Sequence, residues 1–389
     1  MRILHTSDWH VGKTIRGISR LIEHEAVLAE IRAIADREAV DLVLVAGDVF
    51  ENASPGPDAA RIAYRALLDL AQEGRQVVVI GGNHDSQAGL DALRPLFHAA
   101  GVVVLGQPAA PDAGGVITLP TRCGQAAHLA LLPFPSQRYV VKADALMGQE
   151  ARDNVATYAE TVRRIVAALT AGFTDDTVNL LLAHLMVRGG VLGGGEREAQ
   201  TFLDYAVDPM MFPPNLHYAA LGHLHRHQSV GGLVPAYYSG SPLQLDFGET
   251  RDDKSVSIVD AAPGQPAVVR AVPLDAGRRL STVHGTLAEL TEQAGTFGED
   301  FLRVVVREQR RAGLADEVRE LLGENAVDIR VEAEAPEARP RDTGPRTSRT
   351  HHEMFAEFLT ERGHEDPRML ALFDDLLDEA TRTPVAESA

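Results

Sequence analysis

Five short polar segments, spread over the first 225 residues, constrain this chain more than any other feature of its sequence. Each contains side chains that bind metal ions, and most follow a short apolar run that predicts a buried strand. The segments are Asp8-Trp9-His10, Gly47-Asp48, Gly82-Asn83-His84-Asp85, His184 and Gly222-His223-Leu224-His225. Because ligands of open α/β sheets bind beyond the carboxyl ends of strands, the segments predict one site assembled from distant parts of the chain.

The side chains of these segments have the chemistry of a two-metal site. Carboxylate, amide and imidazole ligands suit manganese, iron or zinc, and no thiolate is among them. The predicted ligands are too many for one ion and suit two ions that share a carboxylate; they are Asp8, His10, Asp48, Asn83, His184, His223 and His225. Two such ions suit hydrolysis of phosphate esters. His84 exceeds the ligand count, so we expect it to transfer protons, with Asp85 orienting its imidazole.

Five longer stretches carry a resemblance to a known family. They are Met1–His10, Val45–Phe50, Gly82–Asp85, Ala220–Arg226 and Tyr238–Pro242. Together they resemble the calcineurin-like metallophosphoesterase superfamily and, within it, the bacterial SbcD family, the nuclease subunits of SbcC–SbcD DNA-repair complexes. The motifs cover roughly the first two-thirds of the chain, and beyond about residue 270 the resemblance rests on layout.

The resemblance implies a fold and a domain order. The expected fold is α/β: a two-sheet metallophosphoesterase core flanked by helices, a small α+β capping domain and a C-terminal helical partner-binding tail. The expected bounds are 1–270 for the nuclease domain, 271–335 for the capping domain, 336–350 for a linker and 351–389 for the tail. The tail would bind the ATPase partner.

The resemblance also implies ligands and partners. One ion would be held by Asp8, His10, Asp48 and His225, and the other by Asp48, Asn83, His184 and His223. The ions would be Mn²⁺, the substrate DNA, and the partner an SbcC-type ATPase, with a homodimer formed through helices near residues 57–100. One position departs from the archaeal relatives, which carry a histidine where this chain has Glu51.

Apolar spacing supports an α/β core. Apolar residues recur every three or four positions in Glu23–Glu38, Pro57–Glu73, Ala88–Ala100 and Ala151–Leu169, which predicts helices. Strand-like runs lie between and after them. In the expected capping domain, Leu287–Gln293 and Leu314–Leu322 predict helices, and Phe301–Val306 and Val327–Val331 predict strands.

The net charge of the chain does not match the charge expected of a DNA-binding protein. The formal net charge is −18, which is opposite to that of a free-standing DNA binder. Either the acidity serves solubility alone, or a partner supplies much of the phosphate affinity. The single cysteine, Cys123, excludes a disulfide framework, and we expect it to be buried or partly buried. No apolar run approaches the ~20 residues that span a bilayer, and no leader precedes the first motif, so we expect a cytoplasmic, nucleoid-associated protein without a membrane anchor.

Three features leave alternatives open. The glycine-rich stretch 186–200 is either a plain connector or a loop that moves with DNA. Four arginines form either a solvated face or a strip that contacts the DNA backbone; they are Arg303, Arg307, Arg310 and Arg311. Two short amphipathic helices in the tail dock either on their own nuclease domain or, as we favour, on the partner; their large apolar residues are Phe355, Phe358, Leu372 and Phe373.

Two rival functions would use the same fold. A phosphatase or phosphodiesterase that acts on a small phosphoester would have the same ligands, but it would not need the module after residue 270 or the tail. A non-catalytic scaffold would be expected to have lost ligands or His84, and this chain has lost none of them.

Overall fold

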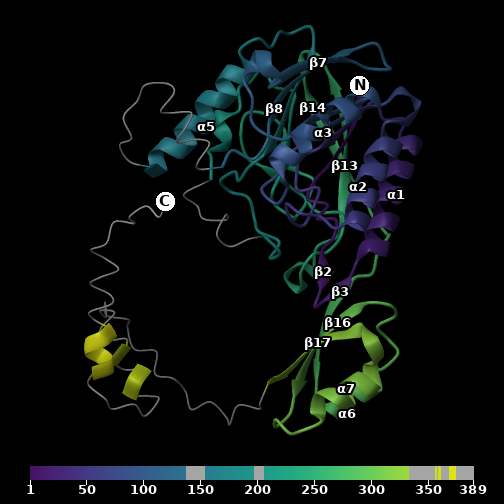
Figure 1. Cartoon of the computed structure of the whole chain (residues 1–389), viewed down its shortest axis with the longest axis vertical. Coiled ribbons are helices and arrows are strands. Elements are labelled where there is room, and N and C mark those ends of the chain that lie inside the picture. Colours follow the sequence, from purple (N-terminus) through teal and green to yellow (C-terminus); the bar gives the residue numbers. More distant parts are fainter. Residues whose placement is uncertain (137–153, 197–205, 333–354, 357, 361–367, 374–389) are drawn as a thin grey trace. The chain divides into compact units, whose positions relative to one another are not determined.

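The computed structural model describes residues 1–136, 154–196, 206–332, 355–356, 358–360 and 368–373 (Figure 1). The chain divides into two compact units, Met1–Ala333 and Glu334–Ala389. Among the described helices, none combines the length and the hydropathy that crossing a bilayer requires.

A six-stranded mixed sheet carries the first three metal-binding segments. Its order is β14-β13-β1-β4-β5-β6, and β1, β4, β5 and β6 run parallel. The strands are β1 (Arg2–Thr6), β4 (Leu42–Val45), β5 (Gln76–Ile80), β6 (Val102–Leu105), β13 (Ser255–Ala262) and β14 (Gln265–Pro273). The parallel strands are joined through α1 (Leu21–Arg37), α2 (Pro57–Leu70) and α3 (Gln87–Ala99). The segments that follow β1, β4 and β5 therefore meet at one edge.

A second six-stranded sheet carries the other two segments. Its order is β11-β12-β10-β9-β8-β7, with β8, β9, β10 and β12 parallel. The strands are β7 (Val116–Pro120), β8 (Ala126–Leu132), β9 (Val178–His184), β10 (Tyr218–Gly222), β11 (Gln228–Val230) and β12 (Ala236–Tyr238). His184 ends β9 and Gly222 ends β10, and the two residues are paired in the sheet. The last ligands thus lie at the carboxyl edge of this sheet too.

The two sheets pack face to face and are covered by helices on their outer sides. Side chains such as Ile3 and Val78 from the first sheet and Leu182 from the second share one buried apolar cluster. Residues at helical spacing on α1, including Val27 and Ile31, cover the first sheet together with α2 and α3. The second sheet is covered by α5 (Asn154–Thr170). This is the predicted two-sheet core flanked by helices, and it directs both sets of ligands to one end.

A smaller parallel sheet follows the core. It consists of β15 (Leu280–Gly285), α6 (Leu287–Gln293), β16 (Phe301–Arg307), α7 (Leu314–Leu322) and β17 (Ala326–Glu332), in the strand order β15-β16-β17. Both helices match their predicted ranges, whereas the apolar pattern does not predict β15. The module has its own apolar cluster. A second cluster joins it to the core: Phe247 and Ile15 pack with Leu280 and Phe301. Ile15 lies in the short hairpin of β2 (Thr14–Ile15) and β3 (Ile18–Ser19).

The structure corrects the expectation for Cys123 and bears on the clustered arginines. Cys123 is exposed, not buried, because it lies in the turn that joins β7 and β8. Arg303 and Arg311 form ion pairs with Asp328 and Glu317 respectively, and Arg310 donates to the backbone oxygen of Val331 at 3.5 Å. Three of the four clustered arginines thus make contacts within the module. The predicted linker, 336–350, and most of the tail lie outside the described residues.

The described part of the tail is helical. These residues are 355–356, 358–360 and 368–373. The ring of Phe355 stacks on that of Phe373, with centroids 4.1 Å apart, and contacts that of Phe358. Leu372 is exposed. Three of the four predicted partner-binding side chains thus contact one another.

Candidate metal centre

The carboxyl edges of the two sheets bring the first predicted set of ligands together. Asp8, His10 and His225 each offer a ligand atom, and these atoms lie within 4.8 Å of one another. The same limit holds for Asp8, Asp48 and His184. All of these residues are buried. Segments that follow β1, β4, β9 and β10 thus converge at one place.

Asn83 joins the second set. Its Oδ1 lies 2.8 Å from Nε2 of His184 and 2.9 Å from Nδ1 of His223. The same ring nitrogen of His184 is 3.5 Å from Oδ2 of Asp48. Asn83 therefore links His223 to His184, which in turn faces Asp48.

Asp48 lies between the two sets. Its Oδ2 is 3.7 Å from Nε2 of His10 and 3.5 Å from Nε2 of His184. Its Oδ1 accepts a hydrogen bond from the backbone N–H of His84 at 2.8 Å. One carboxylate thus faces an imidazole of each set, which is the geometry that a shared ligand requires.

The local backbone is strained where the ligands are attached. Four ligand residues have a positive φ that non-glycine residues seldom adopt: Asp8 (53°), His10 (48°), Asp48 (50°) and His223 (108°). Such conformations cost about 1–3 kcal/mol each and cluster at functional sites. Gly47 also has a positive φ (89°), and a Cβ there would lie 2.5 Å from Nδ1 of His184, so glycine fits this position for two reasons. The backbone at this edge thus adopts costly conformations where the predicted ligands are attached.

Outer contacts set the direction of three imidazoles. Nδ1 of His10 faces a Glu51 carboxylate oxygen at 3.0 Å, Nδ1 of His184 faces the Ala46 carbonyl at 2.7 Å, and Nδ1 of His225 faces a Glu249 oxygen at 2.9 Å. A hydrogen-bond acceptor at Nδ1 keeps the imidazole proton on Nδ1, and the lone pair of Nε2 is then free to bind a metal ion. Nε2 of His10 is buried and has no hydrogen-bond partner among the described residues. An ion at this point would satisfy it, so the residues present fit a metal.

Burial and mutual charge perturb the whole cluster. Burial raises the pKa of Asp8 to about 6 and lowers that of His10 to about 4. Burial alone would also raise the pKa of Asp48, but the imidazoles of His184 and His10 hold it well below its usual range. The pKa of His184 rises to about 9, because the Asp48 carboxylate outweighs the effect of burial. The cluster thus needs compensating positive charge, which divalent ions supply when they displace protons.

His84 lies beside the ligands. Its ring is 4.5 Å from that of His10 and nearly perpendicular to it, and its Nδ1 faces the backbone oxygen of Glu51 at 2.7 Å. The sequence predicts the Asp85 carboxylate at that position. The oxygens of Asp85 instead accept hydrogen bonds from the backbone N–H groups of Phe50, Val49 and Gly82, at 2.9, 3.2 and 2.9 Å. Asp85 thus ties two ligand-bearing loops together.

Several residues around the site escape prediction from the sequence. Ser7 Oγ donates to Asp8 at 2.6 Å, and the ring of Phe134 stacks near that of His223. Glu196 accepts from the backbone N–H of His225 at 3.0 Å, and Glu249 contacts the ring of the same histidine. No apolar run or metal-binding pattern marks Glu196 or Glu249, whereas Ser7 stands next to Asp8 in the first motif and Phe134 follows β8. The one signal in the sequence is that Glu196 lies in the glycine-rich stretch and Glu249 follows Tyr238–Pro242.

Comparison with known proteins decides the family. Residues 1–227 match the calcineurin-like phosphoesterase model. The SbcD subunit of the SbcCD nuclease from Bacillus subtilis is 37% identical over 284 residues, which cover 72% of this chain and 71% of that protein. The same subunit from Rhodobacter capsulatus is 41% identical over 70% of this chain and 69% of its own length, and that from Escherichia coli K12 is 33% identical over 75% and 73%. The chain belongs to the SbcD family.

Membership in the SbcD family confirms the resemblance stated from the motifs. The chain is a metal-dependent phosphodiesterase of the nuclease type, with a calcineurin-like phosphoesterase core. The family and the carboxylate–imidazole clusters together support a dinuclear divalent-metal site. The division of individual ligands between the two ions stays a prediction.

Proposed function

We propose that this SbcD-type chain is a two-metal DNA nuclease that acts with an SbcC-type ATPase in DNA end processing and repair. It would degrade double strands from their ends and cut single strands and hairpins. The observation that carries the proposal is the position of Asp48, whose carboxylate faces an imidazole of each ligand set. Two ions that share a carboxylate suit in-line displacement at phosphorus.

In the proposed mechanism the chain holds the ions, orients them and moves one proton. Asp8, His10, Asp48 and His225 would hold one ion, and Asp48, Asn83, His184 and His223 would hold the other. When bound, two divalent ions, Mn²⁺ in this proposal, would supply charge stabilisation for the attacking and the leaving oxygen. His84 would give the leaving oxygen a proton from Nε2 while in its doubly protonated form, and the Glu51 carbonyl, which accepts the proton of Nδ1, would hold the ring in place. Asp85 is a positioning residue for the loops that carry Asp48 and Asn83.

The proposed partners rest on separate observations. The relatives are named as subunits of SbcCD, and the tail of this chain carries a stacked aromatic cluster on short helices. We therefore place the ATPase-binding surface at Phe355, Phe358, Leu372 and Phe373. A homodimer through the helices near 57–100 is supported by two exposed apolar side chains there, Leu68 and Leu96. The protein would act in the cytoplasm, at the nucleoid. The three-stranded module, in this proposal, is the capping domain.

A substrate comparison tests the proposal. The full chain, stripped of metal and supplied with Mn²⁺, is incubated with hairpin DNA, linear duplex DNA and bis(p-nitrophenyl) phosphate, with and without the ATPase and ATP. We expect cleavage of both DNAs, stimulated by the ATPase. Hydrolysis of the small diester with both DNAs left intact would favour the small-phosphoester alternative, and no turnover of any substrate would favour the scaffold.

A further inference from the structure

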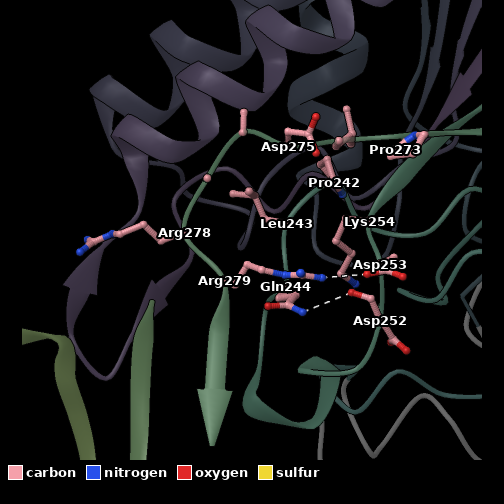
Figure 2. A pocket seen from close by; sticks show the side chains of 13 residues that line it. Pro242, Leu243, Gln244, Asp252, Asp253, Lys254, Pro273, Asp275, Arg278 and Arg279 are labelled. Carbon is pink, nitrogen blue, oxygen red and sulfur yellow. Dashed lines mark hydrogen bonds and ion pairs between the residues drawn. The ribbon is translucent and has the colours of Figure 1, made fainter. Parts of the chain in front are cut away.

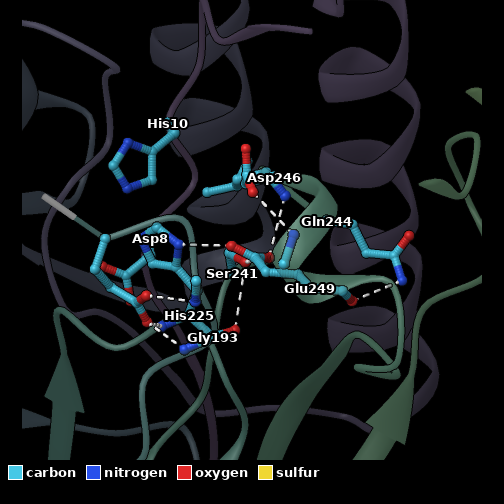
Figure 3. Close-up of polar contacts among 12 residues, drawn as sticks. Asp8, His10, Gly193, His225, Ser241, Gln244, Asp246 and Glu249 are labelled. Atoms are coloured by element: carbon cyan, nitrogen blue, oxygen red, sulfur yellow. Dashed lines mark hydrogen bonds and ion pairs between the residues drawn. The ribbon is translucent and has the colours of Figure 1, made fainter. Parts of the chain in front are cut away.

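The imidazole of His225 is backed by a carboxylate that has no role in the mechanism above. Oε1 of Glu249 lies 2.9 Å from Nδ1 of His225, and both side chains are buried (Figure 3). Glu249 ends the short 3-10 helix η6 (Phe247–Glu249). A carboxylate at this ring nitrogen accepts its proton and leaves the other nitrogen for a metal.

The second oxygen of Glu249 is also held. Oε2 accepts from Nζ of Lys254 at 2.7 Å and from the backbone N–H of Leu245 at 3.1 Å. Both oxygens of the Glu249 carboxylate are therefore fixed, one by the imidazole of His225 and the other by the Lys254 ammonium and a backbone N–H.

Lys254 donates hydrogen bonds both to the backbone of His225 and to the carboxylate of Glu249. Its three donors are directed at Oε2 of Glu249, at Oγ of Ser241 (2.9 Å) and at the backbone oxygen of His225 (3.0 Å). The stem of Lys254 forms part of the wall of a pocket of about 350 Å³, next to Asp252 and Asp253 (Figure 2). One lysine thus ties the backbone of the ligand to the group that orients its ring.

The space around this contact is filled. A Cβ at Gly195 would collide with the Glu249 carboxylate and lie 2.9 Å from Nδ1 of His225. On the other side, Nε2 of Gln244 donates to the backbone oxygen of Glu249 at 3.0 Å, and its Oε1 accepts from the N–H of Leu280 in β15 at 2.7 Å. The smaller module therefore braces the segment that carries Glu249.

His10, the other histidine of the same ligand set, has a similar but looser arrangement. Glu51 faces its Nδ1 at 3.0 Å and is paired with Lys13 at 3.0 Å. The Glu51 side chain is 24% exposed, whereas that of Glu249 is fully buried. His184, assigned to the other ion, is backed by a backbone carbonyl. Both histidines of this ligand set thus face a carboxylate at Nδ1, and Glu249 is the more buried of the two carboxylates.

We propose that Glu249, fixed by Lys254, is a positioning residue that sets the tautomer and direction of His225 as a ligand of one of the two metal ions. The inference rests on the proposed assignment of His225 as a ligand. Because Glu249 contacts His225, a proposed ligand of one ion alone, we expect its loss to weaken that metal site more than the other.

Manganese titration of the full chain tests this inference. The affinities of the two Mn²⁺ sites are measured by electron paramagnetic resonance of free Mn²⁺ in the wild type, in Glu249→Gln and in the charge-balanced double variant Glu249→Gln with Lys254→Met. The double variant guards against unfolding by an unpaired buried lysine. The control is Asp246→Asn, a carboxylate of the same turn that accepts only from the backbone N–H of Gly248.

We expect both Glu249 variants to weaken one site by roughly 10–100-fold, with the second site and the melting temperature close to those of Asp246→Asn. Equal weakening of both sites, or wild-type affinity at both, would overturn the inference. A wild-type chain that binds fewer than two ions would instead refute the two-metal proposal itself, whatever the Glu249 variants do.

Discussion

Replacing His84 by serine separates proton transfer from metal binding. The backbone N–H of His84, not its ring, donates to Asp48, so the substitution keeps that bond. The ring contributes the contact between Nδ1 and the Glu51 carbonyl and a perpendicular packing against His10. If the ring is the general acid, its loss should slow cleavage by about 10²–10⁴. That factor corresponds to about 3–5 kcal/mol of activation free energy.

The assay is single-turnover cleavage of hairpin DNA at saturating Mn²⁺, with metal content measured by elemental analysis. His284→Ser, which removes an exposed histidine of β15, is the control. We expect His84→Ser to bind as much metal and DNA as the control while cleaving far more slowly. His84 also lies within ligand distance of His10 and Asp48. Loss of an ion from His84→Ser would therefore make it a ligand and refute its assignment as the acid.

Two further predictions concern stability and assembly. Burial lowers the pKa of His5 to about 3. Below about pH 6.5, therefore, His5 is protonated in the unfolded chain and stays neutral in the folded chain. Stability of the metal-free protein should therefore be retained above pH 6.5 and fall by roughly 1.4 kcal/mol per pH unit from this group as pH drops towards 3. Urea unfolding of His5→Gln at pH 7 and pH 5 should show a smaller loss than the wild type, and an equal loss would contradict this. Deleting residues 346–389 should preserve Mn²⁺-dependent cleavage of short DNA but abolish capture of the SbcC-type ATPase, since burying each aromatic side chain of the tail against the partner is worth roughly 1.5–3 kcal/mol. Capture of the ATPase at wild-type strength would show that the tail helices do not bind it. A collapse of thermal stability would show that they pack on their own nuclease domain.

The metal-binding segments could be predicted because each follows a strand in sequence. Parallel strands bring their carboxyl ends to one edge, so the meeting of Asp8, Asp48 and His184 follows from the apolar runs before them. The two helices of the smaller module could be predicted as well, because their apolar residues recur at helical spacing. The strand β15 was not, since its sequence, Leu-Ser-Thr-Val-His-Gly, alternates weakly and is only half buried.

The outer contacts of the site could not be predicted, because they depend on how loops meet in space. Asp85 is next to His84 in sequence, yet its oxygens face the backbone of the loop after β4. Glu249 is far from His225 in sequence and follows no apolar run. The positive φ of Asp8 and Asp48 is likewise not marked in the sequence, because aspartate tolerates this conformation without requiring it. Sequence thus indicates which side chains meet at the site, and tertiary packing determines what orients them.

Metal content measured together with cleavage tests the central claim most directly. The wild type and Asp48→Ala are stripped with chelator, equilibrated with Mn²⁺ and analysed for bound metal and for cutting of hairpin and linear DNA. Because Asp48 faces both ligand sets, we expect two ions per wild-type chain, and we expect Asp48→Ala to lose both high-affinity sites and all cleavage. Cleavage by Asp48→Ala at the wild-type rate, in chelator-cleaned buffer with Mn²⁺, would contradict a two-metal centre built on this carboxylate.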